Sequence, residues 1–166
     1  MFFINHAAVR VNMHIESEAC TMTRRQAREQ AFMILFEKSF HPETEVEEIL
    51  DVNVKNGIME DDEFVKLLIK TTWDKLAEID AVIEKNSIGW RISRISKVSL
   101  AVLRLSLCEI LYISEVPVGV SINEAVELCK KFADEEDAPF VNGILGSVAR
   151  SLESGSNPDT QGKSEP

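Results

Sequence analysis

Residues 98–113 read VSLAVLRLSLCEILYI, and this is the most apolar stretch of the chain. Arg104 and Glu109 are its only residues that are charged at neutral pH. Apolar residues fall on nearly every side of a helical wheel drawn through the stretch, which is typical of a helix buried by other helices. The stretch is too long for a strand, and too short and too charged for a membrane span. We therefore predict a central helix in an all-α domain.

The two charged residues of this helix need partners, because an unpaired buried charge is costly. Arg104 and Glu109 are five residues apart, so they do not face each other along one helix. We expect each of them to pair with a group on another element. The expected role is a structural ion pair or a helix cap rather than catalysis.

Amphipathic segments on both sides of the central helix predict further helices. Before it, helices are expected over about residues 23–40, 43–55 and 63–86, with Thr23 as the first cap. After it, helices are expected over about residues 121–133, capped by Ser121, and 139–152. The three helices before residue 87 are typical of a small helical bundle.

The two ends of the chain differ from the part between them. Residues 1–21 show no clear period, and their apolar run is too short and interrupted for a signal peptide. We expect a disordered arm or an upstream extension there, with the native start at Met22. Residues 154–166 are polar and rich in Gly, Ser and Pro, so we expect a disordered tail.

Charge and cysteine content restrict the classes of function. The formal net charge is −10, which argues against wholesale coating by nucleic acid but allows a local basic patch. An odd number of cysteines without a CxxC pair, namely Cys20, Cys108 and Cys129, indicates free thiols in a reducing compartment. The sequence has no metal-binding, nucleotide-binding or nucleophile motif, so no cofactor is expected.

Two stretches are locally basic. Arg24, Arg25 and Arg28 stand in the first turns of the first expected helix, where cations oppose the helix macrodipole. They indicate either a solvated helix start or a phosphate-binding patch. The second stretch is SIGWRISRIS, residues 87–96, a hinge-like link that Arg91, Arg94 and the following Lys97 make basic.

Four blocks of the chain resemble the NusB family of bacterial transcription antitermination factors. They are, in order, RRQAREQAFMILF (24–36), SLAVLRLSLCEI (99–110), VPVGVSINEAVELCKKF (116–132) and FVNGIL (140–145). The most specific part is INEAVEL followed, after a short acidic gap, by FVNG. The resemblance implies an all-α NusB-like fold of two packed helical subdomains with about seven helices, which we expect at residues 22–86 and 87–153.

The same resemblance implies a non-enzymatic role in the cytoplasm. Members of the family bind boxA RNA in the leader of ribosomal RNA transcripts together with NusE, a ribosomal protein. The complex joins NusA, NusG and RNA polymerase and favours read-through of termination signals. Some relatives resemble dimers, and the sequence leaves a homodimer open.

The RNA-contacting positions of the family map onto Arg24, Arg25, Arg28, Phe36, Glu136 and Phe140. Arginines would hold phosphates, exposed aromatic rings would stack on unpaired bases, and a carboxylate would accept from a base amino group. Ser99 maps onto the partner-facing start of the central helix. We expect the three arginines and Phe140 to form one exposed cationic corner.

Two alternative functions stay open. One is a helical protein-interaction module without an RNA role. The other is the NusB-like domain that is attached to ribosomal RNA cytosine methyltransferases. We expect the second less, because the chain ends at Pro166 without a glycine-rich cofactor loop.

Overall fold

The computed structural model describes residues 22–155 of the chain, and these residues fold into seven α-helices and one 3₁₀ helix. The predictions for residues 1–21, including the native start and Cys20, and for most of the tail lie outside the described residues. The elements are α1 (Arg24–Lys38), α2 (Val46–Lys55), α3 (Glu63–Asp74), α4 (Leu76–Asn86), η1 (Ile92–Arg94), α5 (Lys97–Tyr112), α6 (Val118–Phe132) and α7 (Asp137–Gly155). Within the described part, no helix combines the length and apolarity that a membrane span needs.

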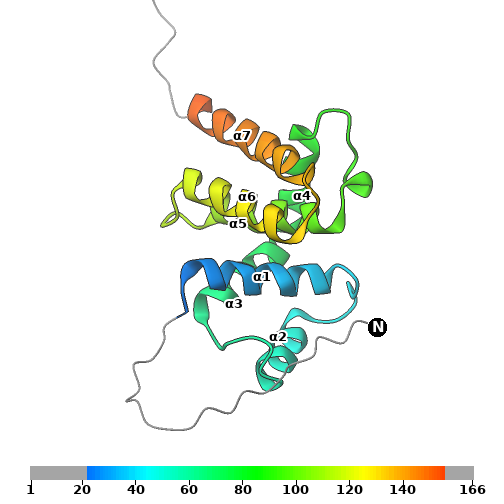
Figure 1. The fold of residues 1–166 in the computed structure, drawn as a ribbon, viewed down its shortest axis with the longest axis vertical. Helices are drawn as coiled ribbons and strands as arrows, with labels where there is room; N and C mark the ends of the chain where they lie inside the picture. Colours follow the sequence, from blue (N-terminus) through cyan, green and yellow to red (C-terminus); the bar gives the residue numbers. More distant parts are fainter. Residues whose placement is uncertain (1–21, 156–166) are drawn as a thin grey trace, which may run out of the picture.

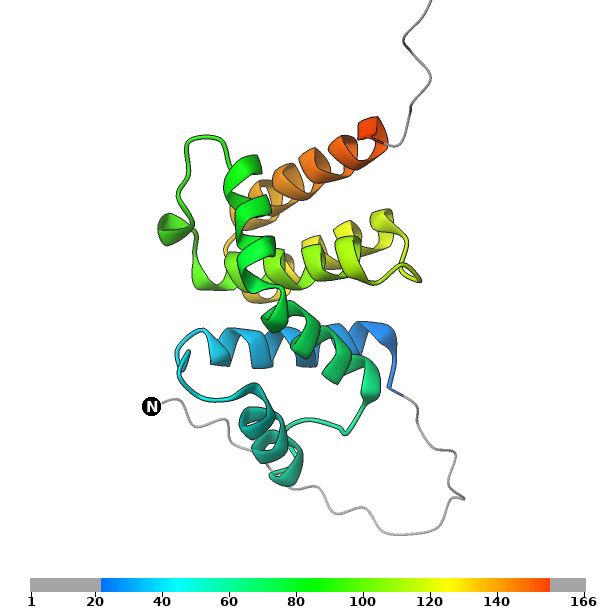
Figure 2. The same ribbon diagram turned by 180° about the vertical axis from the view of Figure 1, so that it is seen from behind.

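The central helix is α5, as predicted from its apolar sequence. It packs against α1 and α3 on one side and against α6 and α7 on the other, so it lies between the two halves of the molecule (Figures 1 and 2). Val102, Leu103 and Leu107 have no exposed surface. The all-α fold is therefore confirmed, and its core is built around this helix.

The two charges of α5 pair with groups on other helices, which confirms the prediction. Arg104 makes a two-pronged ion pair with Asp80 of α4, with Nε to Oδ1 at 2.8 Å and Nη2 to Oδ2 at 2.7 Å. Glu109 accepts from Arg28 of α1 and from the hydroxyl of Ser121 of α6. These bonds hold α5 to three of its neighbours.

The prediction of one helix over residues 63–86 is wrong, because the chain breaks at Lys75 into α3 and α4. Lys75 has φ −100° and ψ 12°, outside the helical region. The apolar period continues across the break, so the sequence does not mark it. The break lets α3 pack on α1 while α4 packs on α5 and α7. Since α4 lies against later helices, the subdomain boundary at residue 86 stays a prediction.

Of the two predicted helix N-caps, the one for α1 is confirmed and the one for α6 is wrong. Thr23 caps α1 in a capping box with Gln26, as predicted. The predicted cap at Ser121 is wrong, because α6 begins three residues earlier at Val118, directly after Pro117. Ser121 is buried inside the helix, where its hydroxyl donates to Glu109 instead of accepting from the backbone.

The two cysteines in the described part are buried free thiols, as predicted. Burial raises the pKa of Cys108 to about 11 and the pKa of Cys129 to about 12. Both thiols are therefore protonated at neutral pH and behave as small core residues.

Candidate nucleic-acid interface

Arg24 and Arg25 lie at the exposed start of α1. The guanidinium of Arg24 lies 3.8 Å from the ring centroid of Phe64, in cation–π contact. Arg25 forms a fork with Glu124 of α6, with Nη2 to Oε1 at 2.8 Å and Nε to Oε2 at 3.1 Å. The hydrogen bond with Glu124 and its negative charge raise the pKa of Arg25. Both arginines stay open to solvent, so a phosphate can approach them.

Arg28 is buried, and the expectation that it is exposed beside the other two is wrong. Its Nε donates to Oε1 of Glu109 at 2.7 Å, and the hydroxyl of Ser121 donates to Oε2 of the same carboxylate at 2.7 Å. All three side chains lie in the interior where α1, α5 and α6 meet. The guanidinium is thus part of a structural network, and only a small part of it faces the hollow that Arg28 lines together with Arg24.

Phe36 belongs to a row of rings along α1. It stacks on Phe32 with centroids 6.0 Å apart and meets the edge of Phe40 at 5.1 Å. Phe32 in turn stacks on Phe132 of α6 at 4.9 Å. Phe36 is partly buried and Phe40 is exposed, so the row leads from the core to the surface at the C-terminal end of α1.

Glu136 and Phe140 lie where α6 turns into α7. Glu136 is exposed in the turn, so its carboxylate is free to accept from a ligand. Phe140, in the first turns of α7, is partly buried and meets the indole of Trp90 edge-on, with centroids 5.9 Å apart. The turn is held to α5 by Asp137, whose carboxylate accepts from the hydroxyls of Ser96 and Ser99.

Ser99 does not lie on the surface. Its side chain is fully buried, and its hydroxyl donates to Asp137 at the start of α7. The backbone N–H of Ser99 donates to the hydroxyl oxygen of Ser96, so the N–H and the hydroxyl of Ser99 are both used within the fold. A partner at this position would meet the residues around Ser99 rather than its side chain.

The structure separates the predicted site residues into two groups at opposite ends of α1. Twelve residues separate Arg24 from Phe36, which is about 18 Å along a helix axis. Lys97 Nζ donates to the carbonyl of Ser39 beyond the C-terminus of α1, which places the start of α5 at that end. Asp137 binds this same start of α5, so the turn with Phe140 lies there too (Figure 1). The expected single corner of arginines and Phe140 is therefore wrong.

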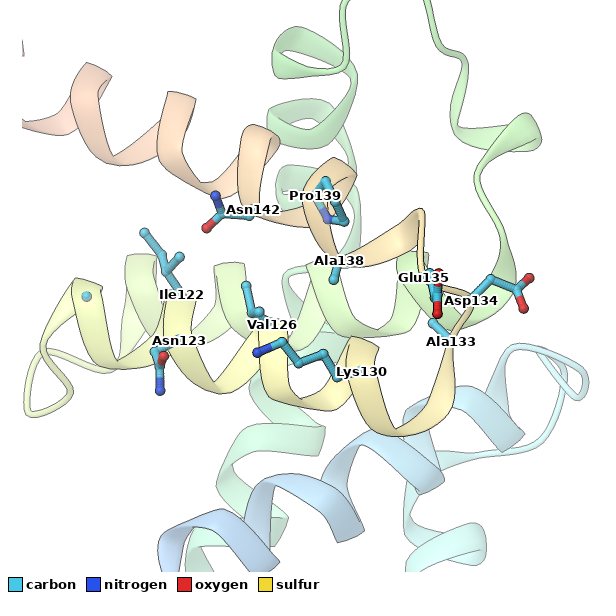
Figure 3. Close-up of a pocket in the computed structure, with 11 residues that line it drawn as sticks. Ile122, Asn123, Val126, Lys130, Ala133, Asp134, Glu135, Ala138, Pro139 and Asn142 are labelled. Atoms are coloured by element: carbon cyan, nitrogen blue, oxygen red, sulfur yellow. The ribbon is translucent and has the colours of Figure 1, made fainter.

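A groove between α6 and α7 was not predicted from the sequence. Its volume is about 890 Å³, with Ile122 and Val126 from α6, Pro139 and Asn142 from α7, and Lys130 along one wall (Figure 3). The acidic turn residues Asp134 and Glu135 close one end. The apolar residues Ile122 and Val126 stand four apart on α6, and this spacing is the one signal of the groove in the sequence. The groove adjoins the turn that carries Glu136.

Comparison with known proteins decides the family. The model of the NusB family matches residues 25–150. The chain belongs to the NusB family. A transcription antitermination protein NusB from Listeria monocytogenes serotype 4a (strain HCC23) is 45% identical over 130 residues, which are 77% of this chain and 97% of that protein.

Solved structures of NusB proteins share the fold. The chain resembles T. maritima NusB with a TM-score of 0.69 and 32% identity, over 78% of this chain and 92% of that one. It resembles a chain in a crystal structure of the antitermination factors NusB and NusE with double-stranded RNA equally well, with a TM-score of 0.69 and 30% identity over 77% and 96% of the two chains. The NusB-like arrangement of seven helices is therefore shown for this chain.

Proposed function

We propose that this protein acts in transcription antitermination as a non-enzymatic adaptor that binds boxA-type leader RNA of ribosomal RNA transcripts together with NusE. The observation that carries the proposal is the family match, since the Listeria relative named as an antitermination protein is 45% identical over nearly its whole length. The similarity to a NusB chain solved with NusE and RNA supports the two ligands. We place the role in the cytoplasm, in a larger complex with NusA, NusG and RNA polymerase. A homodimer that covers the RNA surface stays the alternative state of the free protein.

The proposed roles of the site residues follow their surroundings. Arg24 and Arg25 hold phosphates, because both side chains are exposed. Arg25 can replace the carboxylate of Glu124 by an RNA phosphate while its guanidinium stays in contact with water. Phe36 and Phe140 offer ring surface to unpaired bases, and the exposed carboxylate of Glu136 accepts from a base amino group. Arg28 contributes indirectly, since its buried ion pair with Glu109 fixes α1 against the rest of the fold.

The proposed contact with NusE is set at the junction of α5 and α7. There Ser99 binds Asp137 and so fixes the start of α7 relative to the start of α5. We propose that exposed residues around this junction form part of the NusE surface, with Ser99 as their internal support.

The test is electrophoretic mobility of a boxA-like RNA with the protein alone, with NusE alone and with both. We expect the mixture to give a slower complex than either protein, at a lower protein concentration. Charge reversal in the variant R24E/R25E should raise the Kd about tenfold or more, because two favourable phosphate contacts become repulsive. Arg28 is left intact, since its replacement would disturb the core.

A matched control is K55E/K85E, which reverses two exposed lysines on α2 and α4. Circular dichroism checks that both variants keep their helices. An unchanged Kd for R24E/R25E at matched salt would reject that patch. If the RNA keeps the mobility of free RNA with the protein alone and with the protein and NusE together, the RNA role itself fails. A helical protein-interaction module then becomes the better explanation.

A further inference from the structure

The link between α4 and α5, residues 87–97, exposes both apolar and cationic side chains. Ile88 is 93% exposed and Trp90 is 53% exposed, although Ile is among the residue types most often buried and Trp is highly buried on average. Arg91 and Arg94 are exposed as well. The family match gives no function to this combination, and the NusE surface proposed above, around Ser99 and Asp137, adjoins it.

The two arginines of this link are exposed and are not held by an ion pair within the described part of the fold. Among residues 22–155, Arg91 and Arg94 have no carboxylate within ion-pair distance, whereas Arg25 pairs with Glu124 and Lys131 with Glu29. In a chain with a net charge of −10, two neighbouring cations without a counter-charge form a local positive region. An anionic ligand can bind there without first breaking an internal ion pair.

Aromatic rings lie next to these cations. Trp90 meets Phe140 edge-on, so the link touches the turn that carries two of the predicted RNA-contacting residues. At the end of the link, the ammonium of Lys97 lies 4.6 Å from the ring centroid of Phe40, which is itself 52% exposed. Rings thus lie at both ends of the row of cations, with Phe140 and Trp90 before Arg91 and with Phe40 beside Lys97. The link that carries this row runs beside the first turns of α7 (Figures 1 and 2).

We propose that residues 87–97 form a second binding surface for single-stranded RNA, continuous with the Phe140 turn. Arg91, Arg94 and Lys97 bind successive phosphates, and a base stacks on the exposed indole of Trp90. Exposed cations beside open rings favour RNA over an acidic peptide, because single-stranded RNA offers a flat base with each phosphate. This inference rests on the proposed function, and in it the RNA continues from the Phe140 turn onto the link. It also supplies cations at the end of α1 where Phe36 and Phe140 lie, far from Arg24 and Arg25.

The chain offers a direct reporter, because it has two tryptophans and the other one, Trp73, is covered by the ammonium of Lys38 at 4.1 Å. In a W73F background, the fluorescence of Trp90 alone is followed while boxA-like RNA with single-stranded flanks is added in the presence of NusE. We expect quenching, because a stacked base covers the indole. W90A should raise the Kd about tenfold. R91Q/R94Q should reduce the slope of log K against log salt by about 1.4, which is about 0.7 for each phosphate that the variant no longer neutralises.

Two controls make the result specific. K55Q carries a neutralised lysine on α2, away from the link, and should keep both Kd and salt slope within error of the wild type. W90F keeps a ring and should recover most of the affinity that W90A loses. RNA trimmed to the boxA element should bind the wild type more weakly than flanked RNA and should lose little further affinity with W90A.

The outcomes separate the two proposals. If the wild type with NusE does not bind flanked RNA, the proposed function fails and this inference fails with it. If the wild type binds but W90A and R91Q/R94Q bind equally well, without a change in Trp90 fluorescence, the inference alone is overturned. Quenching by poly-glutamate as strong as by RNA would also overturn it, in favour of an acidic protein ligand.

Discussion

Arg25 and Arg28 lie one turn apart on α1 and have opposite surroundings. Both pair with a glutamate from a later helix, Arg25 with Glu124 and Arg28 with Glu109. The side chain of Arg25 is 57% exposed, while that of Arg28 is 7% exposed. The same residue type in the same motif therefore serves two purposes, since one arginine offers its charge to the surface and the other uses it inside the fold.

The helical wheel alone does not explain this difference. At about 100° per residue, Arg28 falls between Arg24 and Arg25, about 40° from the first and 60° from the second. What separates it from Arg25 is the partner that its side chain meets, because Arg28 reaches the buried Glu109 of α5 while Arg25 keeps an exposed side chain against Glu124 of α6. A cluster of arginines in a sequence thus does not define a cluster on the surface.

The largest effect is expected from R28A. Removing one partner of a buried pair leaves Glu109 as an uncompensated buried charge, which costs about 3–5 kcal/mol. Urea unfolding followed by circular dichroism measures the decrease in stability. The double variant R28M/E109L replaces the whole pair by apolar groups and should recover most of it. A decrease below about 1 kcal/mol for R28A would mean that the pair is not a buried one in solution.

A smaller effect is expected from S121A. Its hydroxyl donates to Oε2 of Glu109, and removing a hydrogen bond to a buried charged group costs about 1.5–3 kcal/mol. The matched control is S147A, which removes a hydroxyl bond of 2.8 Å to the neutral amide oxygen of Asn86 and should cost about 1 kcal/mol. The same urea unfolding compares the two. Equal decreases in stability would show that the charge of Glu109 adds nothing to the bond.

The smallest effect on stability is expected from R25Q. The side chain of Arg25 is 57% exposed, and ion pairs of exposed side chains contribute little, so the unfolding midpoint should stay within error of the wild type. RNA binding should change instead, with the salt slope of log K falling by about 0.7 for one phosphate contact. Filter binding at several salt concentrations measures the slope. A destabilisation as large as that of S121A would remove the contrast between the two arginines.

The sequence was sufficient for the fold where a regular pattern reports burial. Apolar residues all round 98–113 predicted the central helix, and the two charges within it predicted partners on other helices; both are confirmed. The break at Lys75 could not be predicted, because the apolar period runs through it. The start of α6 could not be predicted either. Ser121 is a residue type that often caps a helix, but its hydroxyl donates to Glu109 inside the fold.

The candidate site was predictable only in part. Glu136 and Phe140 came from the resemblance, and the structure places them at one exposed turn with Trp90 beside them. The burial of Arg28 and Ser99 depends on partners that lie far along the chain, Glu109 and Asp137, and no local pattern reports such pairs. The open charges of the 87–97 link were visible in the sequence, but their lack of counter-charges required the structure.

The carboxylate of Glu109 joins residues that leave the ribosome at very different times. Arg28 precedes it by 81 residues and Ser121 follows it by 12. At a synthesis rate of about 5–20 residues per second, the first helix waits about 4–16 seconds for the anion that neutralises its inward-facing cation. During that interval hydration, not packing, stabilises this arginine, so α1 cannot close its core before the second half of the chain has been made.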